Sequence, residues 1–455
     1  MPKPPVKAIA AAHSRLGSKA MPAQPMPGGD ESRTGLLWLA AVSCLAGSIT
    51  GFIVAMFRLV LEQANLWRQE WIARAHVWPV AGALLTVAVV AGAAACAAWM
   101  VRRFSPGAAG SGIPHVEAVA KGQLPPETLA LFPVKFLGGL LAIGGGLALG
   151  REGPSVQMGA KVGMYLGKRF HLTHPESIAL LAAGGGAGLA TAFNAPIAGA
   201  VFVLEELLRC FETRMAIAAL GASSCAIAVA RVFLGSEPDF RVAPMPFFGH
   251  GTGVLFLTLG IAVGFAGMAY NETIVGALAL AGRLRWRVEA RAALIGAVVG
   301  ALAWMAPAAV GGGDLLTQQA LSGSYSVVLI LGMFALRFLL GPVSYAAGTP
   351  GGLFAPMLVL GAELGLLFSA LCGLVLPHQP VPAAAFAMVG MAAFFTAVVR
   401  APVTGIILVV ELTAGFSQLL PMLWACFPAM LIPTLFRVRP IYDMLSPPAV
   451  QRKRG

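Results

Sequence analysis

The sequence places a carboxylate inside an apolar stretch. Glu152 lies in the run GREGP, Gly150–Pro154, and the stretches on either side of this run are almost free of charge. A charged side chain at membrane depth costs about 2.5–3.5 kcal/mol or more, so residues of this kind are kept for function. A related run, GLFAP at Gly352–Pro356, follows later in the chain. The recurrence predicts that one site is built from two halves of the chain.

Three short runs carry the pattern of an anion site formed by helix starts. Each places glycine before proline at the beginning of an apolar stretch: GSGIP at Gly110–Pro114, GREGP at Gly150–Pro154 and GLFAP at Gly352–Pro356. The first backbone N–H groups of a helix carry partial positive charge and can bind an anion without a fixed cation. Glycine lets the ion approach the backbone, and proline is tolerated in the first helical turn. Taken singly, each run also fits a loop or an ordinary helix entry.

Two of these runs belong to a longer internal repeat. A constant offset of 202 positions relates Gly150, Pro154, Gly159, Ala160 and Gly163 to Gly352, Pro356, Gly361, Ala362 and Gly365, and also Lys135 to Arg337. An offset of 206 relates Ala195-Pro196, Gly199 and Glu205 to Ala401-Pro402, Gly405 and Glu411. Ordered agreement in two blocks predicts an internal duplication. Identities alone do not reveal the relative orientation of the two copies.

Neighbouring glutamates differ in whether the repeat preserves them. Glu205 has a counterpart in Glu411, whereas Glu206 has none, so we expect Glu205 to be structural and Glu206 to be the specialised residue. A solvated helix end just before Arg209 is the ordinary alternative for this pair. The two basic residues that the repeat preserves either bias the interior towards anions or pair with buried carboxylates.

The composition is that of a polytopic membrane protein. The chain has 455 residues, of which 58% are hydrophobic and 11% are charged, and soluble domains carry roughly 25% charged residues. Several apolar segments, such as Leu124–Gly150 and Pro196–Leu208, are broken by glycine or proline, as expected where helices meet at mid-membrane. The net charge of +12 comes from small basic groups between apolar segments. That pattern is typical of cytoplasmic loops and makes nucleic acid a poor partner.

The ends of the chain and its cysteines are less informative. Residues 1–33 are expected to form a disordered cytoplasmic tail, because they are rich in proline and alanine and lack the apolar core of a signal peptide. The membrane domain is expected to span 34–446, with repeats at about 77–235 and 251–436, and 447–455 to be a short basic tail. The six cysteines and seven histidines are scattered, so we expect no disulfide, no metal site and no cofactor.

Together and in this order, the three helix-start runs resemble the CLC family of chloride channels and chloride/proton antiporters. The resemblance extends from about Thr34 to Leu445, and AFNAP leading to Glu205-Glu206 resembles the bacterial antiporter branch. It implies an all-α polytopic membrane protein with a CLC-type fold of two inverted-topology repeats built from broken and tilted helices. It also implies a transporter and not an enzyme, exchanging chloride for H+. A homodimer with one pathway per subunit, in a bacterial inner membrane with both termini cytoplasmic, is implied as well. The short end after Tyr442 is expected to lack the nucleotide-binding tail of eukaryotic relatives.

The resemblance assigns a role to individual residues. Glu152 would be the gating glutamate, which occupies an anion position when ionised and leaves when protonated, and Glu206 would pass protons to and from the cytoplasm. The anion site would be formed by Ser111 and Tyr442 through their hydroxyls and by backbone near Gly112, Ile113, Arg151, Gly153, Leu353, Phe354 and Ala355. Serine at position 111 favours chloride as the transported anion.

Other functions remain open at this point. A passive chloride channel uses the same fold, although the presence of both glutamates favours exchange. Gly311–Asp314 fits a GxGD pattern and Tyr442-Asp443 a YD pair, as in intramembrane aspartyl proteases, which require the two carboxylates to meet. Without the family pattern, Tyr442 is an ordinary interfacial anchor. His115, where relatives often carry an acid, is the one clear departure.

Overall fold

The computed structural model describes residues 33–245, 252–322, 326–376 and 381–446. The described residues are almost entirely helical, with only isolated bridges between extended residues, which confirms the all-α prediction. The expected tails lie outside the described residues, apart from Arg33, where the first described helix begins. Among the described helices, nine are long and apolar enough to cross a membrane. The chain is therefore a multi-pass membrane protein.

The first half of the chain runs from a long N-terminal helix to the helix that precedes the central linker. Its helices are α2 (Arg33–Ala75), α3 (Pro79–Phe104), α4 (Ile113–Ala120), α5 (Leu131–Gly144), α6 (Glu152–Arg169), α7 (His174–Phe193), α8 (Pro196–Phe202) and α9 (Thr213–Leu234). A single π-helical turn, η2 (Val203–Leu207), continues α8. Within the broken apolar segment predicted over Leu124–Gly150, the continuous helix is α5, Leu131–Gly144. Pro125 and Pro126 cannot continue a helix, and α5 gives way to a turn at Gly145 and Gly146.

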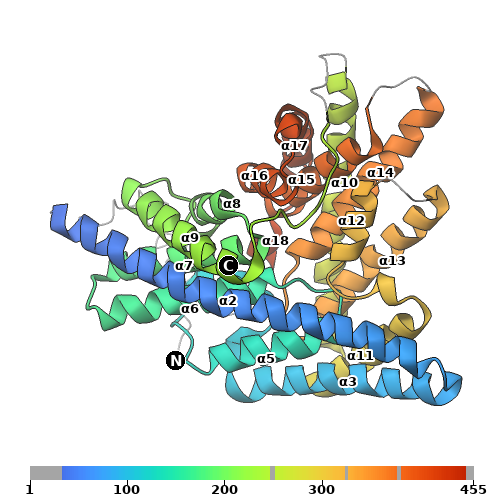
Figure 1. Ribbon diagram of the computed structural model, residues 1–455, viewed down its shortest axis with the longest axis horizontal. Coiled ribbons are helices and arrows are strands. Elements are labelled where there is room, and N and C mark those ends of the chain that lie inside the picture. The colour runs from blue at the N-terminus through green and yellow to red at the C-terminus, as the bar shows by residue number, and fades with distance from the viewer. Residues whose placement is uncertain (1–32, 246–251, 323–325, 377–380, 447–455) are drawn as a thin grey trace, which may run out of the picture.

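The second half repeats this order of helices. They are α10 (Gly253–Arg283), α11 (Val288–Met305), α12 (Asp314–Ser322), α13 (Val327–Tyr345), α14 (Phe354–Val375), α15 (Ala383–Val399), α16 (Pro402–Thr413) and α17 (Leu419–Leu435), followed by the short α18 (Ile441–Met444). Short 3-10 turns lie at Pro106–Ala108, Pro307–Ala309 and Phe416–Gln418. In Figure 1 the colours from blue to green mark the first half and those from yellow to red the second, with α2 crossing the front.

Both halves pack in the same way. Gly159 and Gly184 bring α6 against α7, and a Cβ on either would lie within 2.2 Å of the other's carbonyl oxygen. Their counterparts, Gly361 and Gly390, bring α14 against α15 with the same reciprocal closeness, within 2.5 Å. Helix α2 packs on α7 and α9, as α10 packs on α15 and α17. The predicted repeat boundaries, about 77–235 and 251–436, stay a prediction.

A pair of equivalent residues joins the two halves at the centre. The Gly150 N–H donates to the Gly352 carbonyl at 2.8 Å, and the Gly352 N–H donates to the Gly150 carbonyl at 2.7 Å, in an antiparallel bridge. Reciprocal bonds between residues that the repeat equates define a local two-fold relation. Antiparallel pairing of equivalent segments is the arrangement expected when one copy is inverted relative to the other.

Candidate functional site

The three predicted helix starts are confirmed, and they meet. Helices α4, α6 and α14 begin at Ile113, Glu152 and Phe354, with a proline within the first three residues of each. A Cβ on Gly153 would lie 2.6 Å from the Ser111 Cα, so α6 begins directly against the loop that precedes α4. The first backbone N–H groups of a helix have no partner within that helix. Three helix starts therefore lie close together, around one small region.

The side chain of Glu152 occupies this region. It is fully buried, and its Oε1 accepts a hydrogen bond from the Ala355 N–H at 2.9 Å, in the first turn of α14. Its Oε2 has no hydrogen-bond partner among the described residues. A helix start that holds a carboxylate oxygen can also hold another anion, because both interact with the same N–H group and helix dipole.

The glycines of the central bridge make room for this carboxylate. A Cβ on Gly150 would lie 2.1 Å from Glu152 Oε2, and one on Gly352 would lie 2.6 Å from the same atom. Real Cβ atoms do not come so close, so a side chain at either position would displace the carboxylate. Both copies of the repeat thus require glycine here, although only one copy carries the glutamate.

Ser111 lies at the start of α4 and is fully buried. Its Oγ accepts a hydrogen bond from the Ile113 N–H at 3.1 Å, and its own N–H donates to Tyr345 Oη at 3.3 Å. Gly112 between them adopts a left-handed conformation, with φ of 78°. Sequence reasoning missed Tyr345, which follows no motif and approaches only through the fold.

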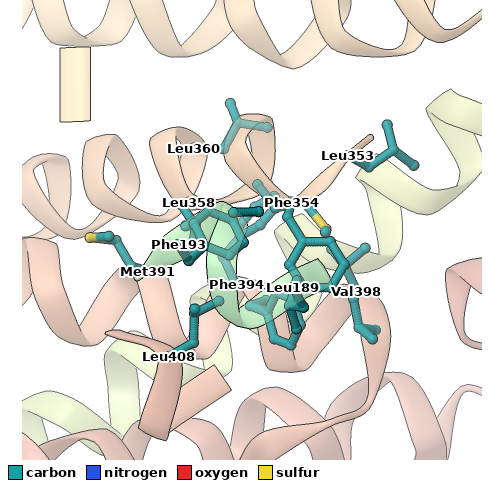
Figure 2. Close-up of a cluster of buried hydrophobic side chains, with 14 of the residues drawn as sticks. Leu189, Phe193, Leu353, Phe354, Leu358, Leu360, Met391, Phe394, Val398 and Leu408 are labelled. Atoms are coloured by element: carbon teal, nitrogen blue, oxygen red, sulfur yellow. The ribbon is translucent and has the colours of Figure 1, made fainter. Parts of the chain in front are cut away.

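A second hydroxyl reaches the site from the end of the chain. Tyr442 on α18 is fully buried, and its Oη has no hydrogen-bond partner among the described residues. Its ring lies nearly parallel to that of Phe354, with the centroids 6.2 Å apart. Figure 2 shows Phe354 in one cluster with Phe193 of α7 and Phe394 of α15, so residues from both halves of the chain pack around its ring. A buried hydroxyl without a protein partner is available to bind an ion or water.

Arg151 points away from this region into an outer charged cavity of about 200 Å³, which Ala355 also lines. Its guanidinium donates to the Ala192 carbonyl at 3.0 Å and pairs with Asp239 at 2.9 Å and Asp314 at 3.5 Å. We call this side the Arg151 end. No sequence pattern singled out Asp239, because it lies in the connection between the two halves.

Glu206 does not join the central region. It lies on η2, which continues the C-terminal end of α8. Ala192, which Arg151 contacts, lies near the opposite end of α8, so we call the η2 side the Glu206 end. The side chain of Glu206 is 3% exposed and pairs with Arg209 at 3.1 Å. On the same turn, Glu205 points elsewhere and accepts hydrogen bonds from the Val403 and Thr404 N–H groups of α16, at 3.1 and 2.7 Å. The structure thus separates the two neighbouring glutamates, and Glu205 caps a helix of the second half.

The preserved basic residues bind carbonyl groups. Lys135 Nζ donates to the Gly110 carbonyl at 2.8 Å, and Arg337 donates to the Gly312 carbonyl at 2.8 Å, in the equivalent position of the second half. Each cation therefore supports the loop before a short helix, α4 or α12. His115 lies on α4, directly after Pro114, and its Nε2 is 3.5 Å from Glu127 Oε1.

The carboxylates of the protease pattern have different partners. Asp314 pairs with Arg151, while Asp443 pairs with Arg209 at 3.3 Å. These arginines lie at opposite ends of α8, so the two aspartates do not form a catalytic pair. Among the described residues, no group of three or more His, Cys, Asp or Glu side chains is placed to hold a metal ion.

Comparison with known proteins agrees with this architecture. A family model described as "Voltage gated chloride channel" matches residues 92–434. The H(+)/Cl(-) exchange transporters ClcA of Vibrio parahaemolyticus and Cronobacter sakazakii are 35% and 36% identical, over 89% and 88% of this chain and 88% of each relative. A slow cyanobacterial Cl-/H+ antiporter superimposes with a TM-score of 0.86 at 31% identity, covering 90% of this chain and 97% of that structure. A CLC-type fluoride/proton antiporter shares the fold, with a TM-score of 0.75 at 21% identity, over 90% of this chain and 99% of that structure.

The match covers most of the chain and most of its relatives, and the family model spans the starts of α4, α6 and α14. This protein is a member of the voltage gated chloride channel family, the CLC family.

Proposed function

We propose that this protein is a secondary active transporter that exchanges chloride for protons. The observation that carries the proposal is the position of Glu152, whose carboxylate binds the Ala355 N–H where three helix starts meet. The relatives named as H(+)/Cl(-) exchange transporters support the same function.

Competition for one position provides the coupling. Ionised Glu152 holds the Ala355 amide and repels chloride, so the anion cannot enter. Protonation removes the negative charge, weakens the charge-assisted hydrogen bond and releases the amide. Chloride then binds in place of the carboxylate. Glu152 passes its proton on towards Glu206, and the ionised carboxylate returns to the amide once chloride has left. One group therefore carries a proton and gates the anion.

The remaining residues of the central region would hold the anion once Glu152 has left. Buried Ser111 and Tyr442 offer hydroxyls, and the backbone at Gly112, Leu353 and Phe354 offers N–H groups at helix starts. Ile113, whose N–H donates to Ser111 Oγ, would orient the Ser111 hydroxyl towards the anion. Gly153, at the start of α6, extends the path towards Arg151 and the charged cavity. This set supplies neutral donors, which hold an anion weakly enough for it to leave. Transport by these groups requires no cofactor.

Glu206 would be the second station for protons. It lies at the opposite end of α8 from the Arg151 end, away from the central region, so protons and chloride use separate routes at this end. We assign the Glu206 end to the cytoplasm of a bacterial inner membrane and both termini to the same side. The presence of a buried carboxylate at both stations favours exchange over the alternative, a passive chloride channel.

Each subunit of a homodimer would hold its own pathway in the lipid bilayer. One chain supplies every residue of the central region as well as Glu206, so a single copy contains a complete route. A covalently linked dimer with Glu152→Gln in one subunit tests this point. The intact subunit should still move protons, at about half the flux of the unmodified dimer per linked pair, whereas a shared pathway would abolish coupling altogether.

The decisive experiment is the reversal potential of the purified protein in planar bilayers or liposomes under combined chloride and pH gradients. An antiporter reverses at a potential between the chloride and proton equilibrium potentials, and the value reports the exchange ratio. In liposomes, a chloride gradient should drive protons uphill. Reversal at the chloride equilibrium potential, with no uphill proton movement, would establish a channel and refute exchange.

A further inference from the structure

The helix that carries Glu206 ends in an unusual way. The π turn η2 at Val203–Leu207 places Glu205 and Glu206 on different sides, and such turns are often found at functional sites. The Cys210 N–H donates to the Leu204 carbonyl at 3.1 Å, which closes the helix end. Between them Arg209 adopts a left-handed conformation, with φ of 52°. Helix ends usually place glycine or asparagine in this conformation, so a long cationic residue here is not the local preference.

Arg209 uses this position to contact two carboxylates on different elements. Its Nη2 donates to Glu206 Oε1 at 3.1 Å, and its Nη1 donates to Asp443 Oδ2 at 3.3 Å. Asp443 follows Tyr442 on α18. The guanidinium, whose side chain is 39% exposed, therefore joins the buried Glu206 to the segment that carries the Tyr442 hydroxyl.

Another ion pair lies beside this one. Helix α4 packs against both η2 and α18, and its buried Glu117 interacts electrostatically with Glu206. Lys121 on the same helix pairs with Glu117 at 3.2 Å. Glu117, Arg209 and Asp443 thus interact electrostatically with Glu206, and Lys121 acts through Glu117. Among the ion pairs of the described residues, Arg209 is the cation that contacts Glu206 directly.

The geometry points to Arg209 as a positioning residue for proton transfer: it holds the Glu206 carboxylate at the Glu206 end and ties it, through Asp443, to the segment carrying Tyr442. This inference rests on the proposed role of Glu206. A neighbouring cation favours the ionised form of a carboxylate, while the nearby Glu117 and Asp443 favour the protonated form. Arg209 thereby sets the pH range over which Glu206 exchanges protons with the solution.

The inference makes opposite predictions for Arg209 and for its second carboxylate partner, Asp443. In Arg209→Gln, the loss of the cation should let Glu206 keep its proton to higher pH. The pH on the Glu206 side at which proton transport is half-maximal should rise by about 1 unit. In Asp443→Asn, one negative charge is lost and Arg209 pairs with Glu206 alone. Both changes favour the ionised form of Glu206, so the half-maximal pH should fall.

The experiment measures proton and chloride fluxes of the purified full-length protein in liposomes while the pH on the Glu206 side is varied. Arg209→Lys should restore most of the wild-type profile, because it returns the charge. Arg214→Gln is the matched control: this arginine is five residues away and forms an ion pair with Glu176, at 4.0 Å. Its profile should match that of the wild type.

The outcomes separate this inference from the proposed function. A coupled wild type with an unshifted Arg209→Gln profile would overturn the role of Arg209 and leave exchange intact. A wild type without proton movement would overturn both. Should Arg209→Gln fail to fold, Asp443→Asn decides the matter: a fall in the half-maximal pH supports the inference, and an unchanged profile refutes it.

Discussion

Glu205, in the first half of the chain, and Glu411, in the second, each cap the start of a helix in the opposite half. Glu205 accepts hydrogen bonds from the Val403 and Thr404 N–H groups at the start of α16. Glu411, on α16, accepts hydrogen bonds from the Ile197 and Ala198 N–H groups at the start of α8, at 3.1 and 2.8 Å. Each carboxylate satisfies two amides that the helix itself leaves free. The two-fold relation seen at Gly150 and Gly352 thus recurs here, in hydrogen bonds from backbone N–H groups to side chains.

Removing either cap should weaken the fold and spare coupling. Glu205→Ala or Glu411→Ala leaves two first-turn amides without their carboxylate, and a lost helix cap costs about 0.5–2 kcal/mol. We expect a lower thermal unfolding midpoint in detergent for each variant, with an unchanged exchange ratio. An altered ratio in Glu205→Ala would contradict its assignment as a structural residue.

Neutralising Glu152 should separate chloride from protons. Glu152→Gln resembles the protonated side chain, so the Ala355 amide is no longer held by a charge. Chloride flux should continue, and proton flux should disappear. Wild-type chloride flux should rise as the pH falls, because protonation removes the competing carboxylate, whereas the flux of Glu152→Gln should be independent of pH. Flux assays in liposomes from pH 4 to 8, chosen to span roughly the titration of carboxylates, report both effects. Retained proton coupling would remove Glu152 from the proposal.

Neutralising Glu206 should affect only the proton. Its side chain lies at one end of α8 and contributes nothing to the helix starts of the proposed anion site. Glu206→Gln should therefore stop uphill proton movement while chloride flux persists and keeps its dependence on pH through Glu152. The neighbouring Glu205→Gln is the matched control and should remain coupled. Equal loss of chloride flux in Glu206→Gln would show that this residue serves the anion path.

A methyl group at position 150 should act through the carboxylate. The Cβ of Gly150→Ala would lie 2.1 Å from Glu152 Oε2, and its three nearest atoms all belong to Glu152. Overpacking of this kind costs about 1–3 kcal/mol. Thermal unfolding of Gly150→Ala, Glu152→Ala and the double variant forms a mutant cycle. Gly150→Ala should reduce stability much less when Glu152 is already alanine. Additive effects of the two substitutions would show that the new methyl group does not act through the Glu152 carboxylate.

Removing the Tyr442 hydroxyl should weaken chloride binding without weakening the fold. Tyr442 Oη is buried and has no hydrogen-bond partner among the described residues, so Tyr442→Phe breaks no bond within that part of the protein. Loss of one neutral donor to an anion costs about 1.5–3 kcal/mol, or roughly a tenfold or greater loss of affinity. Calorimetric titration with chloride measures the affinity, and the unfolding midpoint should not fall. Unchanged affinity would place the hydroxyl outside the anion site.

Local features of the sequence predicted much of the site. The starts of α4, α6 and α14 depend on glycine and proline at fixed positions, which act on the backbone within a few residues. The duplication was visible because both copies need the same glycines, at the bridge and between paired helices. The end of α5 was missed where apolar residues continue through turns, since hydropathy reports burial in the membrane and not backbone conformation.

Only the tertiary structure decided which groups meet. Gly150 and Gly352 were predicted to be equivalent, but their reciprocal hydrogen bonds and the inversion that these imply required coordinates. The Glu152 contact with the Ala355 amide and the Arg209 bridge to Asp443 join residues some two hundred positions apart. Contacts of this kind depend on how helices pack and not on which residues are neighbours in the chain. The sequence by itself thus determined where the three glycine–proline helices α4, α6 and α14 begin and which carboxylate is unusual, and the packing of two inverted halves decided what that carboxylate binds.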